Sequence, residues 1–568
     1  MNSTSSITPL KRFFNLLEEE KNQVYAIYFY AILNGLVALS LPLGIQAILN
    51  FILGGRMTTS WVLLVIVVAI GVAFGGFLQI SQLQITEKFQ QRIFSKAGLS
   101  FAYRLPRVKT EILHGEYGPE IVNRFFDTVN LQKGISKLLV EFTTAVLQMI
   151  FGLLLLSFYH PTFIVFGIVL FIILILIFYF TSPKGMETAL KESSYKYQTA
   201  FWLQEIGRTL NTFKLVGNTR LPILRADKLI QRYVDFRTKH FAVLILQYKI
   251  MVGFKVLIIT SLLVAGSLLL INDQISIGQF VAAEVIIVLV INSVEKVILS
   301  LETVYDTLVA VEKLGVVMDL ELERSEGSDK LVVSQPEGLK LAMENVVFQP
   351  LDVRNPILNG ATLTISPGKK VAVTGKSGSG KSALLALFSG LYEDYQGKVL
   401  VNDLSIEMIQ LEKYRGLVGD CLEFGEIFQG TIKENILVGR DVNSEQFENV
   451  LELVGLKDYI YQLPDDLNTE LQPEGKGLPR ALAQSILIAR SLVGEPKAII
   501  MENALRYVNP EFKPKITEYL MNGNWTLVMI TDDPVILQSC DEIIVMDSGK
   551  VGIQGSYEDY INYTRKNQ

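Results

Sequence analysis

The residues with the clearest chemical signature form the run Gly-Lys-Ser-Gly-Ser-Gly-Lys-Ser. This spacing is that of a phosphate-binding loop, in which glycines let the backbone wrap so that its N–H groups face the phosphates. Lys381 is placed to reach the β- and γ-phosphates, and Ser382 to bind a magnesium ion. The candidate nucleotide contacts are Gly375, Lys376, Ser377, Gly378, Ser379, Gly380, Lys381 and Ser382. The sequence therefore predicts ATP and Mg²⁺ as ligands.

The elements that must position this loop are visible on both sides of it. The apolar run from Lys370 to Thr374 predicts a buried strand, and the run from Ser382 to Phe388 predicts the start of a helix. A strand before and a helix after the loop argue against a chance match. From residue 341 onward, strand patterns alternate with helix patterns, which favours an α/β fold with a parallel sheet.

The first 300 residues contain six apolar stretches, each long enough to cross a bilayer core. They are Val24–Phe51, Trp61–Ile80, Leu138–Tyr159, Phe163–Phe180, Ala242–Ile271 and Ile277–Leu299. Two long, basic links, 87–133 and 183–240, are expected to face the cytoplasm as helical extensions of the spans, and the short links to face outside. Pro9–Lys21 is amphipathic and is expected to lie along the inner membrane surface.

Composition and charge narrow the class of protein further. The net charge is −5 and there is no polybasic block, so nucleic acid is excluded as an expected partner. The two cysteines, Cys421 and Cys540, fit a reducing cytosol. Met1–Glu20 lacks a signal-peptide pattern, and the first span is expected to act as the membrane signal. The predicted division is 1–21 amphipathic segment, 22–311 membrane domain, 312–340 linker and 341–568 nucleotide-binding domain.

The order of several motifs resembles the ATPase domain of ABC transporters. They are Met343–Phe348, the phosphate loop, Gly430–Ile436, Ile488–Leu492 and Glu542–Lys550. With six spans ahead of it, the chain resembles a half-transporter of the type I exporter fold, and most closely the bacterial type I secretion and bacteriocin exporters without their peptidase domain. The resemblance implies a six-span helical membrane domain followed by an α/β P-loop NTPase. It implies an inner-membrane protein with a cytoplasmic ATPase domain that works as a dimer.

The sequence departs from this family at the positions that face ATP. Its only histidines are His114, His160 and His240, so no switch histidine follows the phosphate loop. The family's signature LSGGQ falls on Leu478-Pro-Arg-Ala-Leu482, where proline removes an N–H and side chains block close approach of the backbone. Gly475 and Gly477 lie just upstream and are expected to form a turn.

The remaining departures concern the metal, the general base and the adenine. Glu502 stands where an aspartate supports magnesium, so Ser382, Glu423 and Glu502 are the candidate metal ligands. Asn503 stands at the general-base position, and an amide cannot accept the proton of water. Asp532 takes the switch-histidine position and Asn509 that of the D-loop aspartate. Pro350 replaces the aromatic that stacks on adenine, with Phe348 as a possible substitute or a core residue. No catalytic residue is intact.

These losses imply weak or absent hydrolysis by this chain alone. The leading hypothesis is the degenerate half of a heterodimeric ABC exporter, with a competent ABC half-transporter as partner and a secretion adaptor as a further candidate. The alternative is a catalytically silent pseudo-ABC scaffold or regulator, and an active homodimer is a third reading. Asn123–Gln132 and Glu205–Thr219 match the family's coupling helices by position. The substrate is not readable, although Glu284 is a candidate contact inside the membrane.

Overall fold

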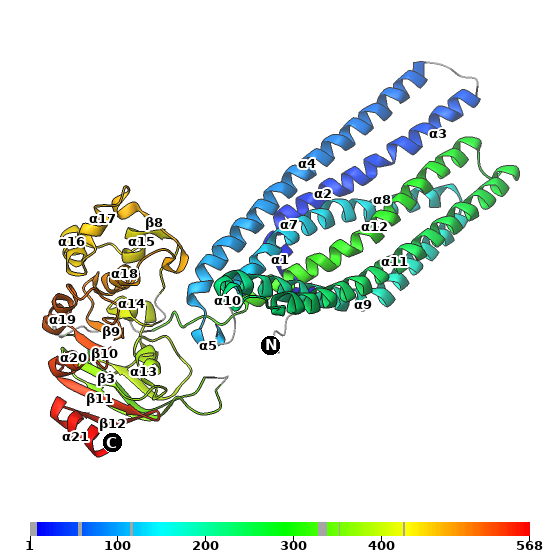
Figure 1. The fold of residues 1–568 in the computed structure, drawn as a ribbon. Helices are drawn as coiled ribbons and strands as arrows, with labels where there is room; N and C mark the ends of the chain where they lie inside the picture. Colours follow the sequence, from blue (N-terminus) through cyan, green and yellow to red (C-terminus); the bar gives the residue numbers. More distant parts are fainter. Residues whose placement is uncertain are drawn as a thin grey trace. The chain divides into compact units, whose positions relative to one another are not determined.

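The computed structural model describes residues 8–54, 59–113, 118–327, 338–350, 353–423 and 426–567. The chain forms two compact units (Figure 1). Unit 1 comprises Met1–Pro106 and Tyr117–Leu320, and unit 2 comprises Arg107–Glu116 and Glu321–Gln568. His114 and residues 328–337 of the predicted linker lie outside the described residues.

The described secondary-structure elements of unit 1 are all helices or helical turns. Its elements are α1 Pro9–Glu19, α2 Lys21–Ala38, α3 Ser40–Leu53, α4 Thr59–Arg104, η1 Leu105–Arg107 at its edge, α6 Gly118–Asn123, η2 Arg124–Phe126, α7 Asp127–Lys137, the π-helical turn η3 Leu138–Phe142, α8 Thr143–Tyr159, α9 Thr162–Arg208, α10 Leu210–Val216, α11 Leu221–Ile271 and α12 Ile277–Met318. Six of its helical stretches are long and apolar enough to cross a membrane, which confirms the six predicted spans.

The predicted helical extensions are present in α4, α9 and α11, which run 46, 47 and 51 residues without a break. The third span differs, because a 3₁₀ turn and a π turn divide its extension into α6, α7 and α8. The first span is also divided, at Leu39 between α2 and α3. At the other end, α12 continues to Met318, past the start of the predicted linker, because Val311, Leu314 and Val317 keep an apolar face buried.

The long helices of unit 1 pack side by side. Figure 1 shows α9 beside α11 and α3 beside α4, and these pairs are in contact. Lys255 of α11 and Glu295 of α12 form an ion pair at 3.3 Å, so these two charges inside the spans are held by pairing between helices. Glu284 is half-buried on α12.

The amphipathic α1 uses its two faces differently. Leu10 and Phe14 are more than half exposed, as expected for side chains that enter a lipid surface. On the other face, Arg12 lies 3.4 Å from Glu312 and 2.5 Å from Asp319, both near the end of α12. The helix is therefore tied to unit 1 by charge and by the buried Leu17, while Leu10 and Phe14 remain exposed.

Unit 2 contains three sheets. The strands are β1 Leu341–Phe348, β2 Leu358–Ile365, β3 Lys370–Thr374, β4 Gln396–Val401, β5 Leu404–Ser405, β6 Val418–Cys421, β7 Gly430–Thr431, β8 Glu470–Leu471, β9 Ala498–Glu502, β10 Thr526–Ile530, β11 Glu542–Asp547 and β12 Lys550–Gly555. The largest sheet has the order β12-β11-β3-β10-β9-β6, with only β12 antiparallel to its neighbour. The predicted parallel sheet is thus confirmed, and β3 occupies its interior.

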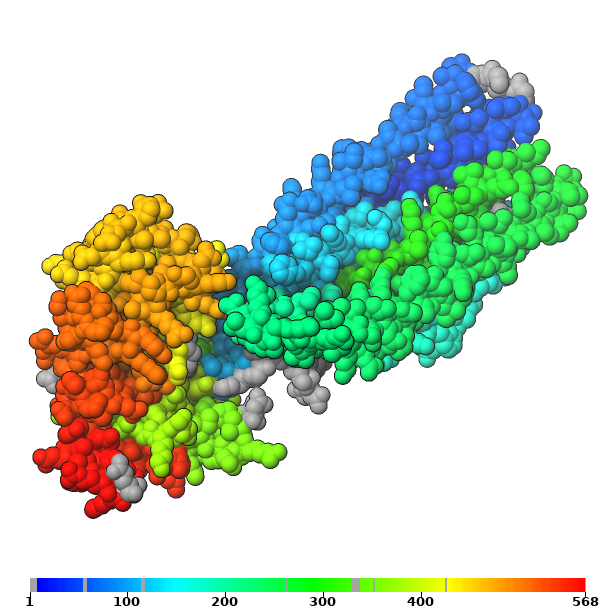
Figure 2. All heavy atoms as spheres, viewed as in Figure 1, coloured from blue at the N-terminus to red at the C-terminus, as the bar shows by residue number. Residues whose placement is uncertain are grey.

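Helices cover this sheet and extend beyond it. They are α5 Thr110–Leu113, α13 Lys381–Phe388, η4 Ile406–Met408, α14 Leu411–Arg415, α15 Ile432–Leu437, α16 Ser444–Leu453, α17 Lys457–Ile460, η5 Asp466–Asn468, η6 Pro473–Gly475, α18 Arg480–Leu492, α19 Lys513–Asn522, α20 Pro534–Ser539 and α21 Tyr557–Asn567. In Figure 2 the yellow surface of α15 to α17 forms one end of unit 2 and the red surface of α21 the other.

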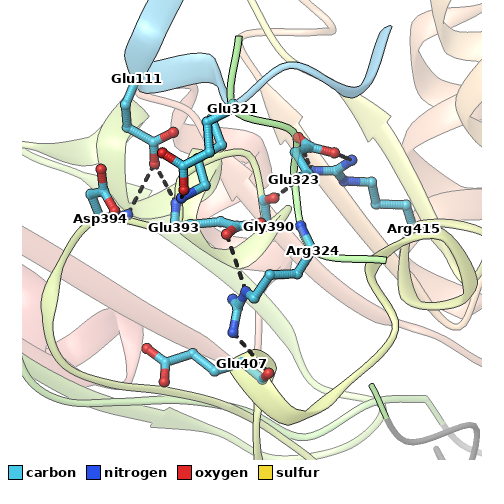
Figure 3. A network of polar contacts seen from close by, with 10 residues as sticks. Glu111, Glu321, Glu323, Arg324, Gly390, Glu393, Asp394, Glu407 and Arg415 are labelled. Atoms are coloured by element: carbon cyan, nitrogen blue, oxygen red, sulfur yellow. Dashed lines mark hydrogen bonds and ion pairs between the residues drawn. The ribbon is translucent and has the colours of Figure 1, made fainter. Parts of the chain in front are cut away.

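A short piece of the first cytoplasmic link belongs to unit 2. Val108 forms an isolated antiparallel bridge with Leu322, which lies just after α12 in the sequence. The buried Glu111 carboxylate accepts the backbone N–H groups of Glu393 and Asp394, the latter at 3.0 Å (Figure 3). Both strands of the bridge are therefore anchored on the loop that follows α13.

The first cytoplasmic link is divided between the two units. Asn123–Gln132, whose coupling role stays a prediction, lies in unit 1, whereas Arg107–Glu116 is the piece of the first link that clusters with unit 2. The reason is local, because Arg324 pairs with Glu393 at 3.1 Å and Arg415 pairs with Glu323 at 2.6 Å (Figure 3). These pairs hold the bridge partner strand, and through it the residues around Val108.

Candidate nucleotide site

The phosphate loop starts at the end of β3, the strand inside the large sheet. Every residue of β3 is buried, and the chain turns sharply at Gly375, whose φ is +136°. A Cβ added at Gly375 would lie 2.2 Å from the carbonyl oxygen of Met546, so no other residue fits this close approach. Gly378 and Gly380 also have positive φ, at +78° and +98°. The predicted loop therefore has the backbone shape that cradles an anion.

The predicted lysine and serine lie where the loop passes into α13. The Lys381 ammonium donates to the carbonyl oxygens of Gly375 and Lys376 at 2.7 and 2.8 Å, so it folds back over the loop. Ser379 is buried, and within the described residues its hydroxyl has no hydrogen-bond partner. The loop residues thus fit a polyphosphate, which the lysine and the backbone N–H groups would hold.

Two of the three predicted metal ligands meet. Ser382 donates its hydroxyl to Oε1 of Glu502 at 2.5 Å, and Glu502 is only 6% exposed at the end of β9. Within the described residues Oε2 of Glu502 has no hydrogen-bond partner, which suits a cation next to the serine. Glu423 is exposed after β6, and no described contact joins it to Ser382 or Glu502. The extra methylene of glutamate lets its carboxylate reach the serine directly.

The positions of the missing base and the missing histidine lie at the same sheet edge. Asn503 follows β9 with φ of +49°, and its N–H donates to the carbonyl of Ile530 at 3.0 Å. Asp532 follows β10, and its Oδ1 accepts the hydroxyl of Thr374 at 2.6 Å. Because β3, β10 and β9 are parallel neighbours, their carboxyl ends meet and both residues stand next to the phosphate loop.

A polar cleft of about 400 Å³ opens beside these two residues. Its charged lining includes Arg506, Lys513 and Asp533, which sequence reasoning did not single out. Lys513 and Asp533 pair at 2.7 Å, and this hydrogen bond holds the pKa of Asp533 below its usual range. Asp533 also accepts the N–H of Val535 and caps α20. An Asp-Asp pair directly after a buried strand was the only sequence signal for this cleft.

The altered signature segment also has its predicted local effect. Pro479 is the N-cap of α18, and it makes no side-chain hydrogen bond. Arg480 is the first helical residue, and its guanidinium lies 5.8 Å from the centre of the Tyr507 ring. Gly475 and Gly477 have φ of +64° and +92°, as expected for a turn. A bulky cation thus occupies the helix start where the family has serine and glycine.

Phe348, the candidate substitute for stacking on adenine, is a core residue. It is 2% exposed and packs on Tyr392 with ring centres 4.7 Å apart, as its alternation in β1 indicated. Pro350 follows β1 and lines a pocket together with Tyr395.

Comparison with known proteins decides the family. A model described as "ABC transporter transmembrane region" matches residues 24–294, and one described as "ABC transporter" matches residues 358–506. This chain is an ABC transporter. With one membrane region and one ATPase domain it has the arrangement of a half-transporter. It is a multi-pass inner-membrane protein whose ATPase domain is cytoplasmic.

Among curated relatives, the ABC transporter chain is similar to two bacterial translocators. It is 24% identical over 529 residues to the transport/processing ATP-binding protein ComA of Streptococcus pneumoniae, covering 91% of this chain and 72% of ComA. It is 29% identical over 366 residues to the alpha-hemolysin translocation ATP-binding protein HlyB of Escherichia coli O157:H7, covering 64% of this chain and 51% of HlyB. The chain therefore spans about half the length of HlyB.

The fold of the ABC transporter chain also matches a solved structure. A bacterial Atm1-family ABC exporter with ATP bound superposes with a TM-score of 0.84 at 19% identity. The match covers 96% of both chains, so it includes the membrane helices and the ATPase domain alike. This confirms the predicted exporter fold over nearly the whole length.

Proposed function

We propose that this chain is the nucleotide-binding, non-hydrolysing half of a heterodimeric ABC exporter. The observation that carries the proposal is the contrast within one site. The phosphate loop, Lys381 and the Ser382–Glu502 pair are intact in shape, whereas the base position holds Asn503. Loss of a general base typically lowers a rate by about 100- to 10,000-fold. The site is therefore expected to bind a nucleotide without hydrolysing it.

ATP with Mg²⁺ is the proposed ligand of this site. When bound, the metal would neutralise charge on the β- and γ-phosphates. Ser382 and Glu502 would hold it, and Lys381 would turn from the loop carbonyls toward the phosphates. At the base position the amide of Asn503 can donate or accept a hydrogen bond to a water, but it cannot remove the proton. The site then holds its nucleotide without turning it over.

A competent partner is needed because two kinds of defect share one chain. In an ABC dimer each nucleotide lies between the phosphate loop of one subunit and the signature of the other. This chain has Asn503 at the general-base position and Pro479-Arg480 in its signature, so both nucleotide sites of a homodimer would lack a base and a normal signature. A second ABC half-transporter with intact motifs would supply a general base to one of the two sites. The transported substrate is expected to leave the cytoplasm, as the likeness to ComA and HlyB suggests.

The test is affinity purification of the full chain from its native membrane, followed by mass spectrometry of what accompanies it. We expect a second ABC half-transporter in a 1:1 ratio, with a glutamate at the position of Asn503 and a histidine at the position of Asp532. Recovery of this chain alone, with ATP turnover that Lys381→Ala abolishes, would overturn the proposal. Recovery with a membrane protein of another family and no transport would instead support a scaffold.

A further inference from the structure

The carboxylate of Asp532 lies on the side of the phosphate loop where a terminal phosphate is expected. In P-loop NTPases a metal bridges the β- and γ-phosphates. The loop serine and an acid at the end of a neighbouring strand, here Ser382 and Glu502, hold this metal. The Ser382–Glu502 contact therefore marks the side of the loop on which a γ-phosphate would sit, at the ends of β9 and β10. Asp532 occupies this same edge and is fixed there by the hydroxyl of Thr374 at 2.6 Å.

The carboxylate of Asp532 has no ion-pair partner among the described residues. Lys513, which lines the same cleft, is bonded to Asp533 at 2.7 Å. Arg506 also lines the cleft, and its guanidinium lies 5.5 Å from the centre of the Tyr507 ring. A γ-phosphate would thus meet an uncompensated negative charge.

A diphosphate meets less of this repulsion while it keeps the rest of the site. The backbone of Gly375–Ser382 and the Lys381 ammonium would hold the β-phosphate, and the Lys381 ammonium is not bonded to Asp532. The Ser382 hydroxyl and Oε2 of Glu502 would remain available to a metal. Because the Coulomb energy falls with distance, the repulsion is weaker for ADP, which lacks the γ-phosphate, than for ATP.

From this geometry we infer that the phosphate loop of this chain is a nucleoside diphosphate site, which binds ADP at least as tightly as ATP. The inference rests on the proposed nucleotide binding and names the ligand of that same site. A subunit of this kind holds ADP through the cycle of its partner, and the phosphate loop with bound ADP serves as a fixed structural part of the dimer.

The experiment measures the affinity of the full chain in lipid nanodiscs for fluorescent ADP and fluorescent ATP, each with Mg²⁺. We expect wild type to bind ADP with a dissociation constant no greater than that for ATP. Asp532→Asn keeps an oxygen that can accept the Thr374 hydroxyl but removes the charge. This variant should bind ATP about tenfold or more tightly than wild type does, with ADP affinity nearly unchanged.

The matched control is Asp541→Asn, at the amino end of β3 and therefore at the opposite end of this strand from the phosphate loop. Asparagine keeps an oxygen that can accept the backbone N–H of Lys370, so the ratio of ADP to ATP affinity should stay at the wild-type value. Retained ADP binding in each variant shows that the loop is folded.

Two outcomes would overturn the inference in distinguishable ways. Wild type binding ATP about tenfold more tightly than ADP, or Asp532→Asn changing both affinities equally, contradicts the diphosphate preference alone. If neither nucleotide binds, or Lys381→Ala leaves both affinities intact, the proposed nucleotide site itself is wrong, and the inference falls with it.

Discussion

Single residues at the ends of three parallel strands determine the chemistry of this ABC transporter chain. Thr374, Glu502 and Asp532 follow or end β3, β9 and β10, and each makes a hydrogen bond near the phosphate loop. The two bonds join residues 120 and 158 positions apart. The carboxylates of Glu502 and Asp532 thus each accept a hydroxyl group, from Ser382 and Thr374 respectively. Both acids are therefore held in place beside the phosphate loop.

One residue-scale prediction concerns pH. Hydrogen bonding to Lys513 lowers the pKa of Asp533, so the ionised form favours the folded state. For a carboxyl with a lowered pKa, this contribution is present above the unfolded pKa of about 4 and is lost as pH falls through the folded pKa. Asp533→Asn should therefore unfold at a lower temperature than wild type at pH 7.

The two melting temperatures should converge as the pH falls through the lowered pKa of Asp533, because its carboxyl then becomes neutral like the asparagine. Thermal unfolding of the full chain in detergent, followed by intrinsic fluorescence across this pH range, checks the prediction. A difference that does not shrink as the pH falls well below about 4 would mean that the Lys513–Asp533 pair has no part in it.

At the scale of elements, a carboxylate from the first cytoplasmic link forms hydrogen bonds with the loop after α13. Glu111 is buried, and its Oε1 accepts two neighbouring backbone N–H groups (Figure 3). Hydrogen bonds to a charged group contribute about 1.5–3 kcal/mol. Glu111→Ala removes the acceptor, so the amides of Glu393 and Asp394 should exchange faster with solvent. Hydrogen exchange with mass spectrometry on peptides covering 390–396 measures this.

The control for this variant is Glu412→Ala. Glu412 pairs with Arg107 at 2.8 Å, but its side chain is 64% exposed, and exposed pairs contribute little. Exchange at Glu393 and Asp394 should stay at the wild-type rate in this variant. Equal exchange in Glu111→Ala and wild type would show that the Glu111 carboxylate does not hold this loop.

Elements also show what the sequence could and could not predict. The six spans and the strand before the phosphate loop follow from long apolar runs, and the glycines of the loop follow from their spacing. The link segment at Arg107–Glu116 was missed, because α5 has four residues and no periodicity to detect. The bond between Thr374 and Asp532 was also missed, since nothing local couples residues that distant strands bring together.

At the scale of the whole molecule, one chain combines an exporter-type membrane region with an ATPase domain. Its fold matches that of a solved exporter over 96% of the chain, and the Lys255–Glu295 pair joins α11 and α12. The apolar cores of unit 2 are buried, while Asn503 and Asp532 stand at the predicted base and histidine positions. We expect such a molecule to work as one member of a pair.

The rate of ATP hydrolysis by the purified full chain, without a partner, in lipid nanodiscs with Mg²⁺ tests most directly whether this chain binds nucleotide without hydrolysing it. We expect no phosphate release above that of Lys381→Ala, because Asn503 cannot deprotonate water and the charge of Asp532 repels the γ-phosphate. Phosphate release well above that of Lys381→Ala, undiminished in Asp532→Asn, would contradict it, since a base from another part of the chain would then have to serve the site.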